Sequence, residues 1–269
     1  MQEHPNPSNE LSPLHFLDHG AHTATFNMAR DEYLFKHASG AWLCVYAWEP
    51  AAISLGYGQK EKDELDMAAV RSAGLDVVRR ITGGRAVLHD CEITYSVAAD
   101  TGGPFGPDLH STYQAIAVAL QRTLALLGVM ADLEKGSVRD ARAKSGASLP
   151  CFASTARYEL KVNGKKIIGS AQRRDKGRFL QHGSLILENR RDITDYLNLG
   201  AEKKDAYRTM LEHESITLTE ARAGKRSWRE LADAFKAGFS ESFSVEPETD
   251  GLSAEALNEI NSRGVTHRY

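Results

Sequence analysis

Residues able to bind an anion or a carbonyl gather in the run Arg79-Arg80-Ile81-Thr82-Gly83-Gly84-Arg85. Guanidinium groups donate hydrogen bonds to anions, and adjacent glycines let backbone N–H groups approach a ligand closely. The run therefore fits an anion- or carbonyl-binding loop. It also fits an ordinary glycine turn with surface arginines, because Gly-Gly turns are common.

Cysteine and lysine chemistry is the second candidate. Cys151 follows Pro150 in a break rich in Gly and Ser, whereas Cys44 and Cys91 lie within or beside apolar strands. A cation beside a thiol lowers the thiol pKa and raises the fraction of nucleophilic thiolate, so Lys166 near Cys151 would activate it. A small core cysteine and an exposed strand lysine are the alternatives.

Four small or polar residues, Gln181 to Ser184, stand inside an otherwise apolar strand. If they are buried they need hydrogen-bond partners, and Gly183 has no side chain to pack. They predict a sheet face that borders a ligand cavity. An exposed edge strand is the alternative, which the apolar flanks disfavour.

Several standard sites are absent from the sequence. It contains no GxxxxGK[ST], GxGxxG, HExxH or GxSxG motif. His15, His19 and His22 have spacings that suit a metal on a helix, but Gly20 and the polar context favour an irregular surface segment. We therefore predict no metal site.

Composition limits the class of protein. The 269 residues are 42% hydrophobic and 26% charged, as in ordinary globular proteins. No apolar stretch approaches the ~20 residues that span a bilayer. Three cysteines without a CxxC pair argue against a disulfide framework, so the reducing cytosol is the expected compartment. A net charge of −3 disfavours general nucleic-acid binding.

The charge is unevenly placed along the chain. Between Arg139 and Arg178, eleven basic residues outnumber three acidic ones, which gives this window a charge of +8 and the rest of the chain −11. The window fits a docking surface for an acidic partner. Solvated hairpin edges protected by Lys and Arg are the alternative.

The elements that must position these residues mix strands and helices without strict alternation. Residues 1–23 are expected to form a loose tail, and Asn27 is expected to cap a helix that stops at Gly40. WLCVYAW and AISLG are predicted to pair as strands around the Glu49-Pro50 turn. LDVVRR is predicted to be a strand that enters the glycine loop, and residues 109–128 have the apolar spacing of a helix.

A second group of strands surrounds Asn163-Gly164, the best short hairpin signal in the chain. YELKV, KKIIGSAQ and RFLQHGSLIL are predicted to form a three-stranded meander, in which Lys166 shares one face with Ile168 and Ser170. The part from about 190 to 269 is expected to be mainly helical. The sequence thus predicts a single α+β domain over residues 24–269, with a largely antiparallel mixed sheet and packed helices.

Taken together, these motifs resemble the biotin/lipoate protein ligase family, and within it the cysteine-dependent octanoyltransferase branch, the LipM type. The matching text is NMARDEYL, ISLGYGQ, RRITGGRAVLHDCEITYS and PCFASTARYELKVNGKKIIGSAQRRDKGRFLQHGSLIL, over about residues 24–240. The resemblance implies a catalytic domain like those of class II aminoacyl-tRNA synthetases and biotin synthetase. It also implies Cys151 and Lys166 as catalytic residues and a substrate pocket formed by Arg80, Thr82, Gly83, Gly84, Arg85, His89, Gly169, Ser170, Gln172, His182 and Gly183.

The reaction that this branch implies moves an octanoyl group in two steps. Cys151 takes the group from an acyl carrier protein as a thioester, and a lysine of a lipoyl domain then receives it as an amide. The implied acceptors are lipoyl domains of 2-oxoacid dehydrogenases or the glycine-cleavage H protein. The expected enzyme is a cytoplasmic monomer that needs no cofactor or metal and binds neither nucleic acid nor membrane.

Two rival functions remain open at this stage. An ATP-dependent lipoate ligase would make lipoyl-adenylate with ATP and Mg, but such ligases usually carry Gly-Asn after the His-Asp pair, where this chain has Glu92-Ile93. They also lack a cysteine that matches Cys151, and the GRGRxxR loop of biotin ligases is absent here. The second rival is a noncatalytic acyl- or carrier-binding module, which the presence of Cys151 and Lys166 disfavours.

Overall fold

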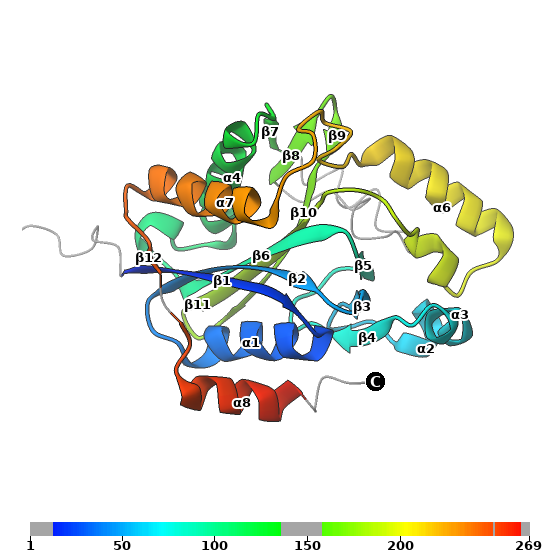
Figure 1. Cartoon of the computed structure of the whole chain (residues 1–269), viewed down its shortest axis with the longest axis horizontal. Helices are drawn as coiled ribbons and strands as arrows, with labels where there is room; N and C mark the ends of the chain where they lie inside the picture. Colours follow the sequence, from blue (N-terminus) through cyan, green and yellow to red (C-terminus); the bar gives the residue numbers. More distant parts are fainter. Residues whose placement is uncertain (1–12, 136–157, 250, 265–269) are drawn as a thin grey trace, which may run out of the picture.

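A mixed six-stranded sheet forms the middle layer of the molecule (Figure 1). The computed structural model describes residues 13–135, 158–249 and 251–264. The sheet confirms the predicted α+β fold, because its first four strands pair antiparallel and its last two add in parallel. In spatial order the strands are β10 (Ile168–Asp175), β11 (Arg178–Ile186), β6 (Glu92–Asp100), β2 (Ala41–Trp48), β1 (Leu14–His22) and β12 (Glu248–Thr249).

Helices cover both faces of this sheet. On one face lies α1 (Ala24–His37), with α8 (Ala254–Gly264) packed outside it (Figure 1). On the opposite face α4 (Leu109–Leu126) packs against α7 (Trp228–Phe243). One apolar core fills each side, because successive side chains of a strand point to opposite faces. No helix in the described ranges is both long enough and apolar enough to cross a membrane.

Two small sheets flank the main one. The first has the order β4 (Asp76–Arg79), β3 (Ala52–Leu55) and β5 (Val87–His89). It holds both ends of the arginine–glycine loop, residues 79–85, because β4 ends where the loop starts and β5 begins just after it. The second has the order β7 (Asp132–Lys135), β8 (Tyr158–Val162) and β9 (Lys165–Lys166).

The remaining helical elements are short or lie at the edge of the molecule. α6 (Ala201–Glu214) extends away from the main sheet (Figure 1). η3 (Ile193–Tyr196) and α3 (Met67–Ser72) pack beside the first small sheet, where they share a third apolar core with β3 and β4. The other two short elements are α2 (Glu61–Glu64) and η1 (Gly103–Phe105).

The prediction of a loose tail over residues 1–23 is wrong for residues 14–22, which form β1. Leu14, Phe16 and Leu17 are buried, and this burial stabilises a strand that pairs in parallel with β2. The helix that follows is capped by the Thr23 hydroxyl and not by Asn27. The Asn27 amide instead donates to the carbonyls of His22 and Ala47, which ties α1 to β1 and β2.

The predicted pairing of the strands WLCVYAW and AISLG is also wrong. The first strand, β2, has β1 on one edge and β6 on the other, so neither edge is available to β3. β3 therefore pairs with β4 and β5 in the first small sheet. The loop that follows β4 contacts the main sheet through the hydrogen bond between Thr82 and His182 on β11.

The predicted three-stranded meander is divided between two sheets. β8 and β9 form the hairpin at Asn163-Gly164, whereas β10 and β11 belong to the main sheet. The division falls at Ile167, which is fully buried and donates its N–H to the Leu160 carbonyl. Because the strand breaks there, period-two alternation does not carry Lys166 onto the face of Ile168 and Ser170. The prediction of that shared face is therefore wrong.

Candidate active site

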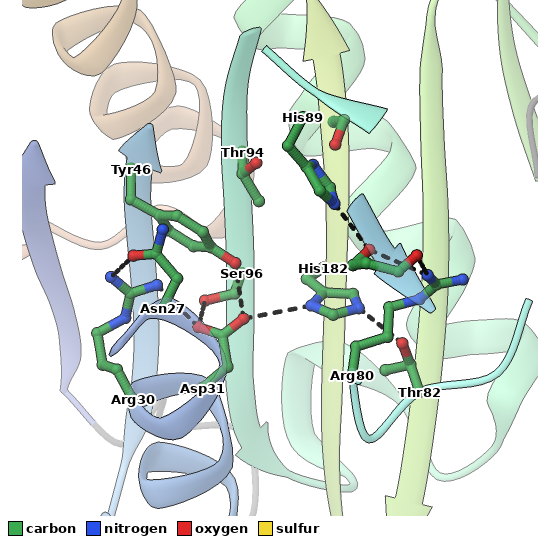
Figure 2. A network of polar contacts seen from close by, with 12 residues as sticks. Asn27, Arg30, Asp31, Tyr46, Arg80, Thr82, His89, Thr94, Ser96 and His182 are labelled. Carbon is green, nitrogen blue, oxygen red and sulfur yellow. Dashed lines mark hydrogen bonds and ion pairs between the residues drawn. The ribbon is translucent and has the colours of Figure 1, made fainter. Parts of the chain in front are cut away.

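A buried carboxylate on α1 is the centre of a polar network between α1 and the strands of the main sheet (Figure 2). Asp31 is 1% exposed and accepts hydrogen bonds from Arg30 (3.0 Å), Tyr46 (2.7 Å) and Ser96 (2.9 Å). Burial alone would raise the pKa of Asp31, but the Arg30 charge and the hydrogen bonds lower it below its ordinary value. Asp31 is therefore ionised at neutral pH.

His182 on β11 links this carboxylate to the arginine–glycine loop. Its Nδ1 lies 3.2 Å from Asp31 Oδ2, and its Nε2 lies 2.6 Å from the Thr82 hydroxyl (Figure 2). Burial lowers the pKa of His182 below 6.5, although Asp31 acts in the opposite direction. Because an ionised carboxylate only accepts, the ring proton belongs on Nδ1, and Nε2 accepts from Thr82. The result is a hydroxyl–imidazole–carboxylate chain.

Arg80 holds the arginine–glycine loop in shape. Its guanidinium donates to the Ser54 carbonyl (2.8 Å) and hydroxyl (3.0 Å) on β3. It also donates to the carbonyls of Gly83 (3.0 Å) and Arg85 (2.6 Å) within the loop. Since the side chain is only 3% exposed, these bonds fix the loop against β3.

The other two arginines of the loop do not converge with Arg80 on one anion. Arg79 donates to the carbonyls of Gly56 and Tyr57. Arg85 forms an ion pair with Glu64 on α2 at 3.2 Å. These guanidinium groups bind neighbouring elements and do not share one anion. Binding of an anion or a carbonyl by the backbone N–H groups of the loop stays a prediction.

Close contact between two loops predicts a specific role for Gly56. A Cβ at this position would lie 2.1 Å from the carbonyl oxygen of Gly84, whereas a Cβ at Gly58 would have no neighbour within 4 Å. Gly56→Ala is expected to displace the arginine–glycine loop and to destabilise the fold by about 1–3 kcal/mol. The matched variant Gly58→Ala should change the free energy of unfolding, measured in urea, by no more than about 0.5 kcal/mol. Equal stabilities of the two variants would contradict this account.

A second polar cluster surrounds His89. Its Nε2 lies 2.7 Å from the Ser54 hydroxyl, and its Nδ1 lies 2.8 Å from Glu92 Oε1 on β6. The imidazole stacks on Trp48 with ring centroids 3.9 Å apart. Because Arg80 also binds Ser54, this cluster joins the loop to β6. Glu92 entered the sequence analysis only as a departure from the ligases, and its role at this junction was missed.

A cavity lies where the two polar clusters meet. Its wall takes Met28 from α1, Val87 from β5, Thr94 from β6 and Ala171 from β10. Its volume is about 30 Å³, which is room for about one or two water molecules. The acyl chain that the sequence resemblance implies would fit only if side chains moved aside, and Met28 has the flexible, unbranched side chain that permits this. Six of the sequence-predicted site residues line it: Arg80, His89, Gly169, Ser170, His182 and Gly183.

The remaining predicted pocket residues lie around this cavity but do not line it. The Thr82 hydroxyl is hydrogen-bonded to His182 Nε2, and the carbonyls of Gly83 and Arg85 accept hydrogen bonds from Arg80. Gly84 faces Gly56 across the loop contact. Gln172 donates to Gln181 at 3.2 Å in the pairing of β10 with β11.

Of the two predicted catalytic residues, the structure places one. Lys166 is 4% exposed on β9, and its Nζ lies 3.1 Å from Glu159 Oε1 on β8. It is not a lining residue of the cavity. Cys151 lies outside the described residues. Sequence reasoning missed Glu159, although its alternation with Leu160 in YELKV places it on the face opposite the apolar side chains.

The two cysteines in the described ranges are not activated. Cys44 is fully buried, and burial raises its pKa to about 12. Burial also raises the pKa of Cys91. Since the thiolate is the nucleophile, neither cysteine is in an environment that favours attack on a thioester.

The histidines near the N-terminus have packing roles on β1 and not the irregular setting that the sequence suggested. His22 stacks on Phe26 of α1, and His15 stacks on Trp42 of β2. His19 contacts Arg30 at 3.3 Å, and burial together with the Arg30 charge lowers its pKa to about 4. Within the described ranges, no group of three or more His, Cys, Asp or Glu side chains is arranged to hold a metal ion.

Comparison with known proteins decides the family. Residues 23–240 match the lipoyl protein ligase A/B catalytic domain. The chain belongs to this family. The sequence prediction of a biotin/lipoate ligase type of catalytic domain is thereby confirmed. The matched range begins just before α1 and ends in α7, so it contains the arginine–glycine loop and β8 to β11, and it leaves β1 and α8 outside.

Relatives of this lipoyl ligase A/B family member share most of its length. A protein of Lysinibacillus sphaericus named octanoyltransferase LipM is 36% identical, and the alignment covers 94% of this chain and 95% of that protein. A protein of Brevibacillus brevis with the same name is 36% identical, with 88% and 89% covered. The likeness therefore extends well beyond the motifs around the cavity.

Solved structures of the family share the fold. A lipoate-protein ligase A bound with ATP superposes with a TM-score of 0.73 at 20% identity, over 95% of each chain. A putative lipoate protein ligase from T. acidophilum with bound lipoic acid has a TM-score of 0.72 at 20% identity, over 94% of each chain. At these identities the likeness establishes the architecture alone.

Proposed function

We propose that this family member is an octanoyltransferase that moves an octanoyl group from a carrier thioester to a lysine of a lipoyl domain. The observation that carries the proposal is the 36% identity, over 94% of the chain, to a protein named octanoyltransferase LipM. The cavity bordered by Gly169, His182 and Gly183 supports it, because these strand residues lie where the resemblance places the acyl chain.

The proposed chemistry has two half-reactions at one carbonyl carbon. The Cys151 thiolate attacks the octanoyl thioester, the carrier thiol leaves, and an octanoyl-cysteine forms. The lysine amine of the acceptor then attacks this thioester, the Cys151 sulfur leaves, and an amide remains. A thioester is higher in energy than an amide, so the transfer needs no ATP. Neither described cysteine is activated, which supports Cys151 as the nucleophile.

Lys166 is proposed to stabilise the Cys151 thiolate and the developing oxyanion, with backbone N–H groups near Gly83 or Gly169 as further donors. Its buried pairing with Glu159 supports a fixed position for the ammonium group. A cation held in a low-dielectric interior acts more strongly on a nearby charge than one in water. The same pairing explains how a charged lysine is tolerated at 4% exposure.

The proposed donor is an acyl carrier protein, and the proposed acceptors are lipoyl domains of 2-oxoacid dehydrogenases or the glycine-cleavage H protein. The basic window was expected to steer the donor, yet part of it has structural contacts. Arg174 donates to Thr112 and Pro107, and Arg178 binds Asp100. Charge reversal at these two arginines would disturb the fold, so Lys176, which is exposed, is the better probe of carrier docking.

An assay without ATP tests the function. Purified enzyme, octanoyl-carrier and an apo lipoyl domain are mixed without ATP or magnesium, and the domain is analysed by mass spectrometry. We expect an octanoyl increment on the domain, and none when free octanoate with ATP and magnesium replaces the carrier. Strict dependence on ATP with free octanoate or lipoate would move the protein to the ligase class. Acyl or carrier binding without turnover would make it a noncatalytic module.

A further inference from the structure

A second and larger cavity opens beside the first. This groove has a volume of about 500 Å³ and lies between β5, the start of β6, the segment after β11, and α6. Val87 belongs to the walls of both cavities, so the groove and the first cavity are neighbours. None of the predicted site residues that the structure describes lines the groove, and the function proposed above assigns it no role.

The groove is negatively charged. Among the described residues, seven carboxylates and three arginines line it, which gives this part of the lining a formal charge of −4. The arginines are already paired within the groove, with Arg191 on Asp90 at 3.3 Å and Arg208 on Asp192 at 2.7 Å. Arg190 approaches Glu188 at 3.6 Å. An excess of carboxylates favours a cationic ligand.

Glu92 stands on the wall between the two cavities. Its Oε1 accepts hydrogen bonds from His89, Thr94 and Ser184, and all three of these residues line the first cavity. Glu92 itself lines the groove, its side chain is 1% exposed, and its Oε2 has no hydrogen-bond partner among the described residues. The buried Oδ2 of Asp90, which also lines the groove, has none in this part of the chain either.

Two buried carboxylate oxygens without partners among the described residues are unusual, because leaving such an acceptor unsatisfied costs about 1–3 kcal/mol or more. An ammonium group carries three N–H donors and a positive charge. It can therefore donate hydrogen bonds to these oxygens and also balance the negative charge of the groove. The acceptor substrate of the proposed reaction brings such a group on a long, thin side chain. The groove is therefore complementary to the acceptor lysine, because its carboxylates offer negative charge and hydrogen-bond acceptors to the ammonium group.

We propose that the groove admits the acceptor lysine and that Glu92 Oε2 binds its ammonium group and removes a proton from it. This inference rests on the proposed octanoyl transfer. In the second half-reaction the amine nitrogen forms a bond to the octanoyl carbonyl carbon, and the C–S bond to the enzyme breaks. The electron pair of that bond stays on sulfur. One ammonium proton passes to Glu92 Oε2 before attack, and the second is lost from the new amide nitrogen and returns the thiolate to a thiol.

Glu92→Gln isolates this role from the structural one. The glutamine carbonyl keeps an acceptor for His89, Thr94 and Ser184, while its NH₂ group places donors where Oε2 stood. Glu202→Gln is the matched control, because Glu202 lies exposed on α6, carries the same charge and does not line the groove. Both variants should unfold in urea with midpoints close to that of the original enzyme.

The two half-reactions are measured separately by rapid quench and mass spectrometry. Octanoyl-carrier is first mixed with enzyme alone, and the octanoyl-enzyme is then mixed with an apo lipoyl domain. For Glu92→Gln we expect acylation within about twofold of the original rate and transfer to the domain slower by about 10²-fold, the size of a general-base contribution. Glu202→Gln should leave both steps unchanged.

The pH profile gives a readout that a packing role would not produce. The transfer defect of Glu92→Gln should shrink as the pH rises toward about 10, where a lysine amine loses its proton without help. The titratable or charged groups around Glu92 are His89, Asp90, Cys91, Glu188, Arg190 and Arg191, and all of them remain in both variants.

Three outcomes would overturn the inference. Unchanged transfer by Glu92→Gln would show that Oε2 has no part in the reaction. An equal loss in both half-reactions, constant with pH, would assign Glu92 to packing. If the original enzyme forms no octanoyl-enzyme from the carrier, the proposed function fails first, and the role of Glu92 fails with it.

Discussion

Cys151→Ala is expected to abolish the octanoyl-enzyme and to lower octanoyl transfer by at least ~10³-fold, as removal of a covalent nucleophile does elsewhere. No described cysteine can replace it, because Cys44 is fully buried with a pKa of about 12 and burial raises the pKa of Cys91. Cys151→Ser should at best form a slow oxygen ester, since an alcohol is far less ionised than a thiol.

Peptide mapping of the acylated enzyme checks this prediction. The octanoyl increment should lie on the peptide that contains Cys151. Normal turnover with the increment on Cys91, which lines the groove, would make Cys91 the nucleophile and the assigned mechanism wrong. Normal turnover with no acylated cysteine would remove the covalent step altogether.

Lys166 is expected to act on the same chemical step as Cys151. Replacing Lys166 in the Cys151→Ala variant should therefore lower the activity little further. Lys166→Ala alone would leave the Glu159 charge buried without its cation, which is itself destabilising. The double variant Lys166→Met with Glu159→Gln removes both charges, so it tests Lys166 without leaving the Glu159 charge buried beside an apolar side chain. If Lys166 lowers the Cys151 pKa, this double variant should alkylate Cys151 more slowly at pH 7. An unchanged alkylation rate would separate the two residues.

Asp31→Ala is expected to destabilise the fold by about 3–5 kcal/mol, because it leaves a buried charge without its partner. Arg30 is fully buried and is paired with Asp31 at 3.0 Å. The pKa of Asp31 is lowered in the folded state, so its contribution is fully present at neutral pH. That contribution is lost as the pH falls below the ordinary range of an aspartate. Urea unfolding at pH 7 measures the loss.

Removing both charges of this pair should cost much less than removing one. The double variant Arg30→Met with Asp31→Asn keeps nearly the volume of both side chains and removes this buried ion pair. We expect its unfolding free energy to lie closer to that of the original chain than Asp31→Ala does. If Asp31→Ala lowers the free energy of unfolding by less than about 1 kcal/mol, solvent screens the ion pair, and this would contradict the burial seen in the structure.

The same variants bear on the cavity. Asp31 orients His182, which lines the cavity and accepts from Thr82. In the double variant the asparagine amide that replaces the Asp31 carboxylate keeps an oxygen that can accept from His182, so the ring should keep its position. We compare the activities of the two variants. If the double variant is active while Asp31→Ala is inactive, Asp31 serves to stabilise the fold and to position His182.

The sequence alone determined the family and six of the residues that border the cavity. Gly169, His182 and Gly183 were predicted from a polar interruption in an apolar strand and from long motif matches, both of which are local properties of the chain. The mixed sheet was also predictable, because alternation and hairpin signals act over neighbouring residues.

Only the tertiary structure decided how the charged residues are used. Arg79, Arg80 and Arg85 are close in sequence but bind three different parts of the fold. Asp31 and His182 are 151 positions apart and meet because α1 packs under β11. No sequence pattern indicates that Glu92 Oε2 lacks a hydrogen-bond partner in the part of the chain that the structure describes. A hydrogen bond depends on the position and direction of both groups, and those are fixed only when distant elements pack together.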